Sequence, residues 1–301
     1  MSETPEVFNR RAVRRHRDRA ARRLARHDFL LAEAAARLLD RLDDIKRDFP
    51  LALDLGCRTG ILAGARGGRG GVRTLIQCDL SEQMARAARD GDGGPALVAD
   101  EEALPFADGA FDLILSSLAL HWVNDLPGTL VQIRRALKPD GLFLAAMFGG
   151  ETLKELRGAL TEADLATSGG ASPRVSPFAQ VRDLGQLLQR AGFALPVVDA
   201  DTVTVAYTEP ARLLADLRGM GEANAVALRR RSFSRRQVFA QAHENYRRAA
   251  GADAADGGRV PATFQIVYLT AWAPHDSQPK PLRPGSATAS LAAALKDKDK
   301  P

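Results

Sequence analysis

The sequence has few cysteines and few aromatic residues for its length. Only Cys57 and Cys78 occur among 301 residues, and aromatic side chains make up 6%. Two cysteines cannot build a disulfide framework, and both lie in apolar, strand-like stretches, so we expect buried thiols and a reducing compartment. A catalytic cysteine is disfavoured, because a reactive thiol needs an exposed and electropositive setting.

Long apolar runs are also missing. No stretch reaches the eighteen or so apolar residues that a membrane span requires, and the first residues lack the apolar core of a secretory signal. We therefore expect a cytoplasmic protein without a transmembrane segment. A basic N-terminal stretch leaves peripheral association with the inner face of a membrane open.

Several common site patterns are absent as well. The sequence contains neither GxxxxGK[ST] nor GxGxxG, so neither a P-loop nor a dinucleotide fold is supported. Of the five histidines, only His121 and His243 lie in segments expected to fold into the domain, and no metal-ligand spacing links them. An iron centre built from two histidines and a carboxylate therefore has no direct support, and we expect no metal site.

Positive charge is concentrated near the N-terminus. The segment RRAVRRHRDRAARRLARH, residues 10–27, holds nine arginines against the single acid Asp18. Such a segment is a solvated helix face, a docking arm for an acidic partner, a nucleic-acid contact or an arginine-rich presequence. It contains no aromatic residue on which bases could stack, so we expect no stable nucleic-acid partner.

Apolar runs alternate with helical patterns through the first half of the chain. We expect buried strands at 51–55, 74–79, 96–99, 111–116 and 141–147, and helices between them, notably at 81–89 and 126–137. Strand-helix alternation is typical of an α/β fold with a parallel sheet covered on both faces.

The last third has a different order. Helices are expected at 152–167 and 181–191, then β-rich runs at 197–207 and 262–273 that flank a helical insertion at 210–250. This order predicts an antiparallel strand pair and a helical cap. We divide the chain into a basic helical arm (1–45), a main domain (46–273, with cap insertions at about 150–195 and 209–250) and a disordered tail (274–301).

A candidate cofactor site follows the first three strands. In LALDLGCRTG, residues 51–60, the first strand ends at a turn with Gly56 and Gly60, where missing side chains let the backbone approach a ligand. The second strand ends at Asp79, at a spacing where a carboxylate can accept hydrogen bonds from ribose hydroxyls, and the third ends at Asp100. The alternative is that both acids only cap helices or form turns.

These motifs resemble those of the class I S-adenosylmethionine-dependent methyltransferases. The resemblance rests on DLGCRTG, CDLSEQM, DEEALPFADGAFDLILSS and IRRALKPDGLF, in that order. It implies a Rossmann-like, mostly parallel twisted sheet with an antiparallel final strand, and S-adenosyl-L-methionine as the cofactor. It also implies that the loop glycines face the methionine part, that Asp79 binds the ribose and that Asp100 contacts the adenine. The full set that we predict to bind cofactor is Asp54, Gly56, Cys57, Arg58, Gly60, Asp79, Leu80, Asp100 and Glu101.

Further motifs are similar to one group within that superfamily. LHWVNDLP, FGGETLKELR, LRGMGEAN and VPATFQIVYLTAW resemble the methyltransferase-like assembly factors of complex I, the NADH dehydrogenase. This implies a protein substrate, an arginine of an NADH dehydrogenase subunit, which that group hydroxylates. Two alternatives stay open: a malonyl-acyl carrier protein O-methyltransferase of biotin synthesis, and a cofactor-binding assembly chaperone without turnover.

The motif LHWVND supplies the catalytic candidates. His121 is placed to act as a base, Trp122 to form a wall for substrate or cofactor, and Asp125 follows one helical turn after His121. The alternative is that His121 caps a helix and Trp122 belongs to the core.

Arg58 departs from the pattern of both families, which have glycine there. Its guanidinium could pair with the carboxylate of the cofactor's methionine part or crowd the pocket. We expect cofactor binding to be retained, because Gly56, Gly60 and both acids remain.

Overall fold

The computed structural model describes residues 6–92, 94–250 and 258–279. Within these ranges the strands are β1 Leu51–Leu55, β2 Thr74–Asp79, β3 Ala96–Val98, β4 Phe111–Ser117, β5 Leu137–Phe148, β6 Ala194–Tyr207 and β7 Val260–Trp272. The α-helices are α1 Arg10–Ala20, α2 Phe29–Asp43, α3 Ile61–Arg66, α4 Glu82–Asp92, α5 Leu126–Ala136, α6 Lys154–Ser168, α7 Val181–Arg190, α8 Pro210–Gly219 and α9 Arg236–Ala249.

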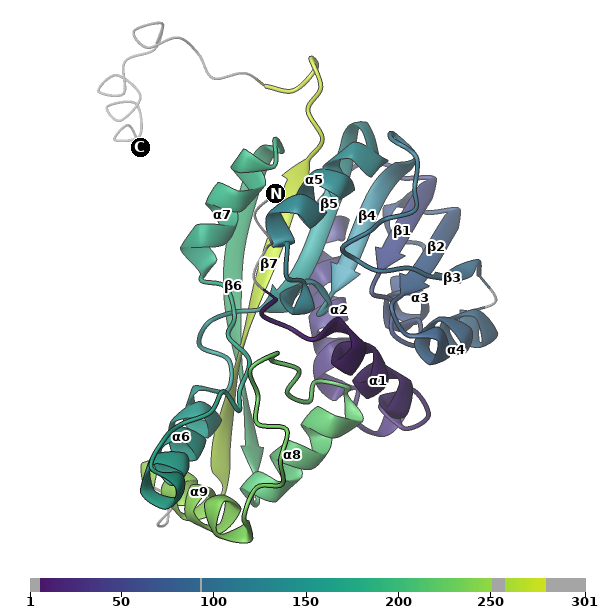
Figure 1. Cartoon of the computed structure of the whole chain (residues 1–301). Coiled ribbons are helices and arrows are strands. Elements are labelled where there is room, and N and C mark those ends of the chain that lie inside the picture. Colours follow the sequence, from purple (N-terminus) through teal and green to yellow (C-terminus); the bar gives the residue numbers. More distant parts are fainter. Residues whose placement is uncertain (1–5, 93, 251–257, 280–301) are drawn as a thin grey trace, which may run out of the picture.

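The strands form one sheet in the order β3-β2-β1-β4-β5-β7-β6 (Figure 1). Neighbours from β3 to β5 are parallel, whereas β7 is antiparallel to both β5 and β6. The predicted α/β fold, with a mostly parallel sheet and an antiparallel end, is confirmed. Several boundaries differ, most of all at β5, which begins at Leu137 and not at 141 because Leu137 already pairs with Phe111 before a register shift.

Two apolar clusters cover the two faces of the sheet. The cluster on one face contains side chains from α2, α3, α6, α8 and α9, and the cluster on the other contains side chains from α5 and α7. Helix α2 shows why the sequence packs this way, since Leu31, Ala35, Leu38 and Leu42 recur at helical spacing and are all buried. Because both faces are covered, the ligand-accessible edge of the parallel sheet is the one where its strands end.

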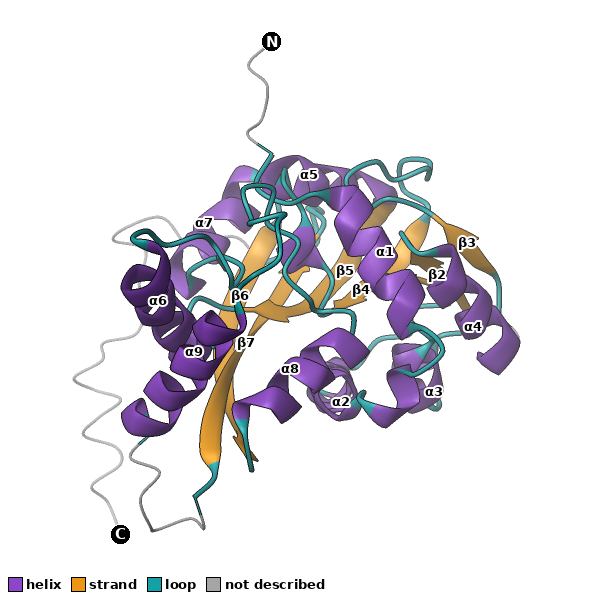
Figure 2. Cartoon of the chain, turned by 60° about the horizontal axis from the view of Figure 1, so that its bottom comes forward, coloured by secondary structure: helices purple, strands orange, loops and turns teal. Residues whose placement is uncertain are grey.

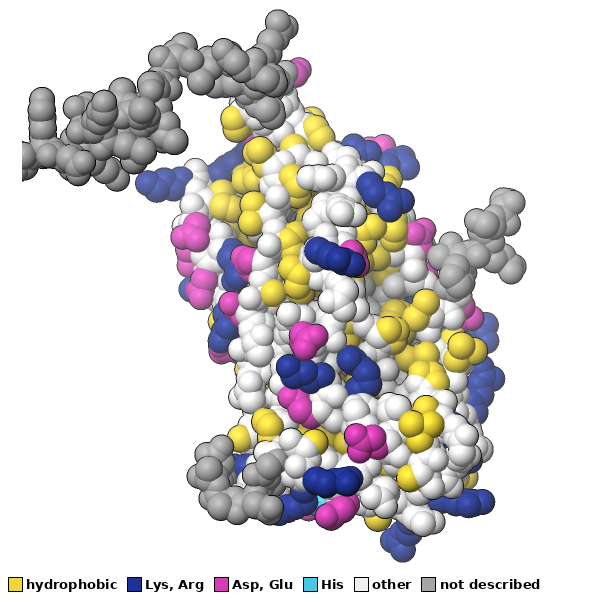
Figure 3. All heavy atoms as spheres, turned by 90° about the vertical axis from the view of Figure 1, so that its left-hand side faces the viewer, with side chains coloured by type: hydrophobic (Ala, Val, Ile, Leu, Met, Phe, Trp, Pro, Cys, Tyr) yellow, Lys and Arg dark blue, Asp and Glu magenta, His cyan; other side chains and the backbone are white. Residues whose placement is uncertain are grey.

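Strands β6 and β7 are longer than the parallel strands and reach past them. Their far ends carry α6, α8 and α9, which form the cap that the insertions predicted (Figure 1). On the side of the molecule that carries α6, α7 and α9, basic and acidic side chains are interspersed among apolar ones (Figure 3). None of the helices in the described ranges combines the length and apolar content needed to cross a membrane.

The basic segment forms α1, which lies across the C-terminal ends of the central strands (Figures 1 and 2). The Asn9 side chain caps α1 by accepting a hydrogen bond from the Ala12 N–H. The chain just before α1 is tied to the cap: Phe8 forms a β-bridge with Val226, and the Asn9 N–H donates to the Ala225 carbonyl. Of the predicted disordered tail, residues 280–301 lie outside the described residues.

Candidate active site

The turn after β1 has the backbone of a ligand-binding loop. Gly56, Arg58 and Gly60 all adopt positive φ values, of 79°, 54° and 84°. A Cβ atom on Gly56 would lie 2.2 Å from the Cβ of Ala119, so only glycine fits there. Arg58 holds a left-handed conformation that usually costs a non-glycine residue free energy, so other contacts must compensate.

Asp79 holds this turn against the end of β2. The Asp79 carboxylate accepts hydrogen bonds from the backbone N–H groups of Arg58 (3.1 Å) and Ser81 (2.8 Å), and its side chain is fully buried. Asp79 therefore lies at the end of a strand and also stabilises the turn, the alternative role that the sequence left open. It remains a prediction that Asp79 binds ribose.

Asp54 stands at the end of β1 without a partner. Both of its carboxylate oxygens are buried and make no hydrogen bond. Burial, and to a smaller degree the charge of Asp79, raise the pKa of Asp54 to about 8. This carboxyl group is therefore largely protonated at neutral pH and can donate a hydrogen bond.

The other predicted neighbours have plainer surroundings. Cys57 and Cys78 are free and buried, as expected, and burial raises the pKa of both thiols well above the ordinary value. Leu80 packs against the small apolar cluster that joins α1, Trp122 and the cap.

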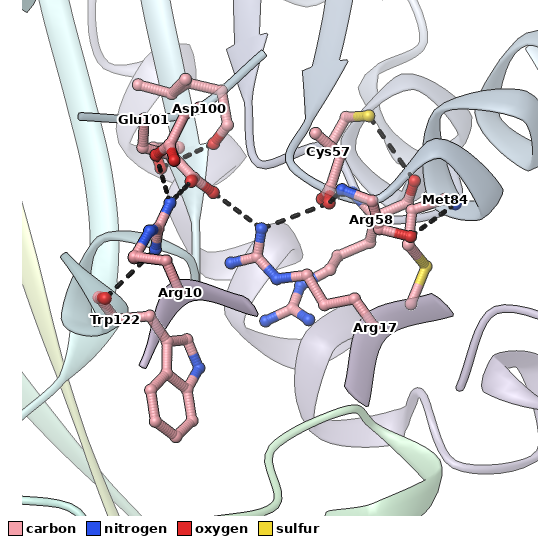
Figure 4. A network of polar contacts seen from close by, with 12 residues as sticks. Arg10, Arg17, Cys57, Arg58, Met84, Asp100, Glu101 and Trp122 are labelled. Carbon is pink, nitrogen blue, oxygen red and sulfur yellow. Dashed lines mark hydrogen bonds and ion pairs between the residues drawn. The ribbon is translucent and has the colours of Figure 1, made fainter. Parts of the chain in front are cut away.

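Two arginines of α1 bind the acids at the ends of β2 and β3 (Figure 4). Arg17 Nη1 lies 2.7 Å from Glu101 Oε1 and 3.2 Å from Asp79 Oδ1, and no part of the Arg17 side chain is exposed. Arg10 donates to Asp100 (2.5 Å), to Glu101 and to the backbone carbonyl of Trp122. Although burial opposes ionisation of Glu101, the charges of Arg17 and Arg10 lower its pKa to about 2.

The Arg58 side chain is buried and bonds to residues outside the turn after β1. Arg58 Nη2 donates to Glu222 Oε1 and to the Leu118 carbonyl (2.8 Å). Burial, followed by the nearby charge of Arg17, lowers the Arg58 pKa, while the Arg58 guanidinium lowers the pKa of Glu222 to about 2 against the effect of burial. Glu222 is thus an ionised carboxylate, and only 3% of its side chain is exposed.

The same carboxylate binds both residues of the His-Trp motif. Glu222 Oε2 lies 3.0 Å from His121 Nε2 and accepts a hydrogen bond from Trp122 Nε1 at 2.8 Å. Burial is the main cause that lowers the His121 pKa, so the ring is neutral at pH 7. Its proton then lies on Nε2, facing Glu222, and the buried Nδ1, which has no partner, is the basic position. The structure thus brings the His121 and Trp122 side chains together on one carboxylate oxygen.

Asp125 lies apart from these two residues. It is exposed, and its carboxylate caps α5 by accepting a hydrogen bond from the Gly128 N–H at 2.9 Å. This is the contact that an Asp at an N-cap position makes. A catalytic role for Asp125 remains a prediction.

An apolar cavity of about 220 Å³ lies beside Glu222. Its walls come from the cap and from the loop before α7, and include Leu156, Leu160, Leu217, Phe178, Phe239 and Phe264. Trp122 and Glu222 also line it, and Glu222 in addition binds Arg58 of the turn after β1.

The residues expected to hold a nucleoside cofactor are present, but the space for it is closed. The cavity beside Asp54, Gly56 and Arg58 measures about 10 Å³, whereas pockets for small molecules hold roughly 300–1,000 Å³. The acids predicted for the ribose and adenine are bound to Arg17 and Arg10 instead. The set of hydrogen-bonding groups fits the cofactor, and this arrangement of α1 does not admit it.

Arg10, Arg17 and Glu222 were not among the residues predicted for the site. Arg10 and Arg17 are seven residues apart, two helical turns, and share the buried face of α1 with Val13. That spacing is the signal in the sequence, but the surrounding arginines hide it. Glu222 lies in LRGMGEAN, a motif whose resemblance to the assembly factors implies no role for a particular residue. Across the described residues, no group of three or more His, Cys, Asp or Glu residues is placed to hold a metal ion.

Comparisons with known proteins agree with this architecture. A family model described as a methyltransferase domain matches residues 53–145. The arginine-hydroxylase NDUFAF5 of Danio rerio is 45% identical over 289 residues, which cover 95% of this chain and 88% of that protein. A malonyl-[acyl-carrier protein] O-methyltransferase of Laribacter hongkongensis is 38% identical, over 87% of this chain and 89% of its own.

A solved structure supports the fold alone. The YcgJ protein of Bacillus subtilis superposes with a TM-score of 0.56 at 15% identity, over 81% of this chain and 99% of that protein. The identity to relatives over most of their length agrees with the sheet order and with the site at the strand ends. The chain therefore belongs to the S-adenosylmethionine-dependent methyltransferase superfamily and, within it, to the family of the arginine-hydroxylase NDUFAF5.

Proposed function

We propose that this protein is an S-adenosylmethionine-binding enzyme that modifies an arginine side chain of a protein, a subunit of NADH dehydrogenase during its assembly. The observation that carries the proposal is the cavity of about 220 Å³ with Glu222 in its lining. An arginine side chain has a long apolar stem and a planar cation at its end. The cavity offers the matching surfaces, apolar walls and an ionised carboxylate.

His121, a group that can move a proton, lies behind the cavity lining, with its ring against Phe148 and Phe178. A guanidinium stays protonated at neutral pH, so its nitrogen becomes a nucleophile only when a base removes a proton. The neutral His121 ring, with Nε2 held by Glu222 and Nδ1 unpartnered, supplies that base. When bound, S-adenosylmethionine supplies an electrophilic methyl carbon. The name of the Danio rerio relative states hydroxylation, which instead inserts one oxygen and consumes an oxidant.

A second candidate is methyl transfer to a malonyl group on acyl carrier protein, as named for the Laribacter relative. Arg218 also lines the cavity and is exposed, so it could pair with an acidic group at the entrance. For either substrate we propose a cytoplasmic location, which the two free, buried cysteines support.

Mass spectrometry of NADH dehydrogenase subunits, from cells with and without this protein, tests the proposal. We expect one arginine to carry an added oxygen or methylene only when the protein is present. A methylated malonyl thioester with unchanged subunits would support the second candidate, and unchanged mass for both would favour an assembly role without turnover.

A variant pair on α6 ties the result to the cavity. Leu160→Trp fills the cavity from its wall and should abolish the modification, while Leu165→Trp, on the exposed side of the same helix, should leave it intact. Equal modification by both variants would show that the substrate binds elsewhere.

A further inference from the structure

Helix α1 takes the place that a ligand would hold at the acids of this site. Arg17 binds Asp79 and Glu101, and Arg10 binds Asp100 and Glu101. Each of these carboxylates lies at the end of β2 or β3, where the superfamily binds its nucleoside cofactor. The positive charges of α1 therefore satisfy the acids while the site is closed.

The closed contact leaves many polar atoms without partners. Arg17 Nε and Nη2, Arg58 Nε and Nη1 and both oxygens of Asp54 are buried and make no hydrogen bond. The two guanidiniums are also close enough for the charge of Arg17 to lower the Arg58 pKa. Buried polar groups without partners and neighbouring like charges raise the free energy of the closed state. They therefore favour a state in which α1 has moved and these groups find partners in solvent or in a ligand.

Besides its two arginines, α1 is held by a buried face that includes Ala12 and Val13 and by a few further contacts of its flanking and polar residues. Before the helix, Phe8 is held by Asn124 through two hydrogen bonds and packs edge-on against Trp122 with ring centroids 5.3 Å apart. Along the helix, His16 bonds to the Ala223 carbonyl and Asp18 to the Ser81 hydroxyl. A rigid-body shift of this short helix would break these contacts without disturbing the sheet.

We propose that α1 is an autoinhibitory cover of the cofactor site, and that the cofactor binds only when α1 moves and Arg17 leaves Asp79. The proposal rests on the cofactor of the superfamily and not on the identity of the substrate. If α1 covers the site, the measured affinity for the cofactor is the intrinsic affinity multiplied by the fraction of molecules in which α1 has moved away. Weakening the closed contact should therefore tighten cofactor binding.

The test combines calorimetry with amide hydrogen exchange of the full chain, using S-adenosylhomocysteine as the probe. Arg17→Gln removes the charge that holds Asp79 and Glu101, and we expect it to bind the probe about tenfold more tightly than the wild type. Arg11→Gln, on the exposed side of the same helix, is the matched control and should bind like the wild type. In the wild type, the probe should speed exchange in α1 and slow it in the turn after β1.

A second variant tests the proposal in case Arg17→Gln does not fold. Phe8→Ala loosens the anchor of α1 but leaves every acid and its arginine in place, so it should also bind the probe more tightly. Weaker binding by both variants, with α1 more protected when the probe is bound, would mean that α1 belongs to the bound state and would overturn the proposal. Failure of all variants to bind would overturn it too, because α1 would then not be what keeps the cofactor out. Neither result bears on the subunit masses, which test the proposed function separately.

Discussion

Asp54 is the residue whose ionisation the fold disfavours most clearly. Its raised pKa, about 8, means that the folded state keeps a proton that the unfolded chain loses near pH 4. The folded state binds more protons throughout this window, so stability falls as pH rises from about 4 to about 8. The shift in pKa corresponds to a loss of at most about 5 kcal/mol in the free energy of unfolding. Water that reaches Asp54 would make this loss smaller.

Asp54→Asn removes this titration. We expect urea unfolding at pH 5.5, 7 and 8.5 to show the variant gaining stability relative to the wild type as pH rises. A constant difference at all three pH values would mean that Asp54 is solvated or paired in solution.

Arg58 and Glu222 form a pair whose members depend on each other. Arg58→Gly relieves a left-handed backbone, worth about 1 kcal/mol, but leaves the buried Glu222 carboxylate without its cation. We expect a net loss of about 2–4 kcal/mol in the free energy of unfolding. Chemical denaturation of Arg58→Gly, Glu222→Gln and the double variant measures it. The double variant should lose less than the sum of the two single losses, and strict additivity would show that the pair is not coupled.

Sequence patterns predicted some residues of the site and not others. Gly56, Asp79 and Asp100 stood out because a strand end, a turn and an acid recur at a fixed interval. The partner of Arg58 could not be foreseen, because Glu222 lies 164 residues away in a loop whose path only the folded cap defines. Asp125 was singled out by its spacing from His121, yet the structure uses it to cap α5.

Among the elements, α1 differs most from what its composition suggests. Apolar runs and helical spacing predict the strands and helices well, because burial of one face follows from those patterns. The arginines of α1 favour a solvated face, and the sequence alone does not show that two of them turn inward onto acids that are distant in sequence.

The cap of α1 offers a test of how independently this helix moves. Asn9→Ala removes the N-cap and should destabilise α1 by about 1 kcal/mol. Amide exchange should then quicken across residues 10–20 and stay unchanged in α5. Asp125→Ala removes the corresponding cap of α5 and should give the reverse pattern. Quickened exchange throughout the domain in Asn9→Ala would show that α1 opens only when the whole fold does.

For the whole molecule, the arrangement of β6 and β7 decides where chemistry can occur. These strands extend beyond the parallel part of the sheet and carry the cap, whose loop delivers Glu222 to His121 and Trp122. One buried carboxylate, Glu222, therefore contacts both the cavity in the cap and Arg58 of the turn after β1. The antiparallel pair and a cap were predicted from the order of elements, but the placement of the cap over the strand ends was not.

A crystal structure of the full chain with S-adenosylhomocysteine tests the central claim most directly, namely that α1 arginines occupy a working cofactor site. We predict the ribose hydroxyls against Asp79, the adenine near Asp100, and α1 displaced so that Arg17 no longer contacts Asp79. A nucleoside bound at these strand ends while Arg17 keeps its bonds to both Asp79 and Glu101, or bound elsewhere on the molecule, would contradict the account.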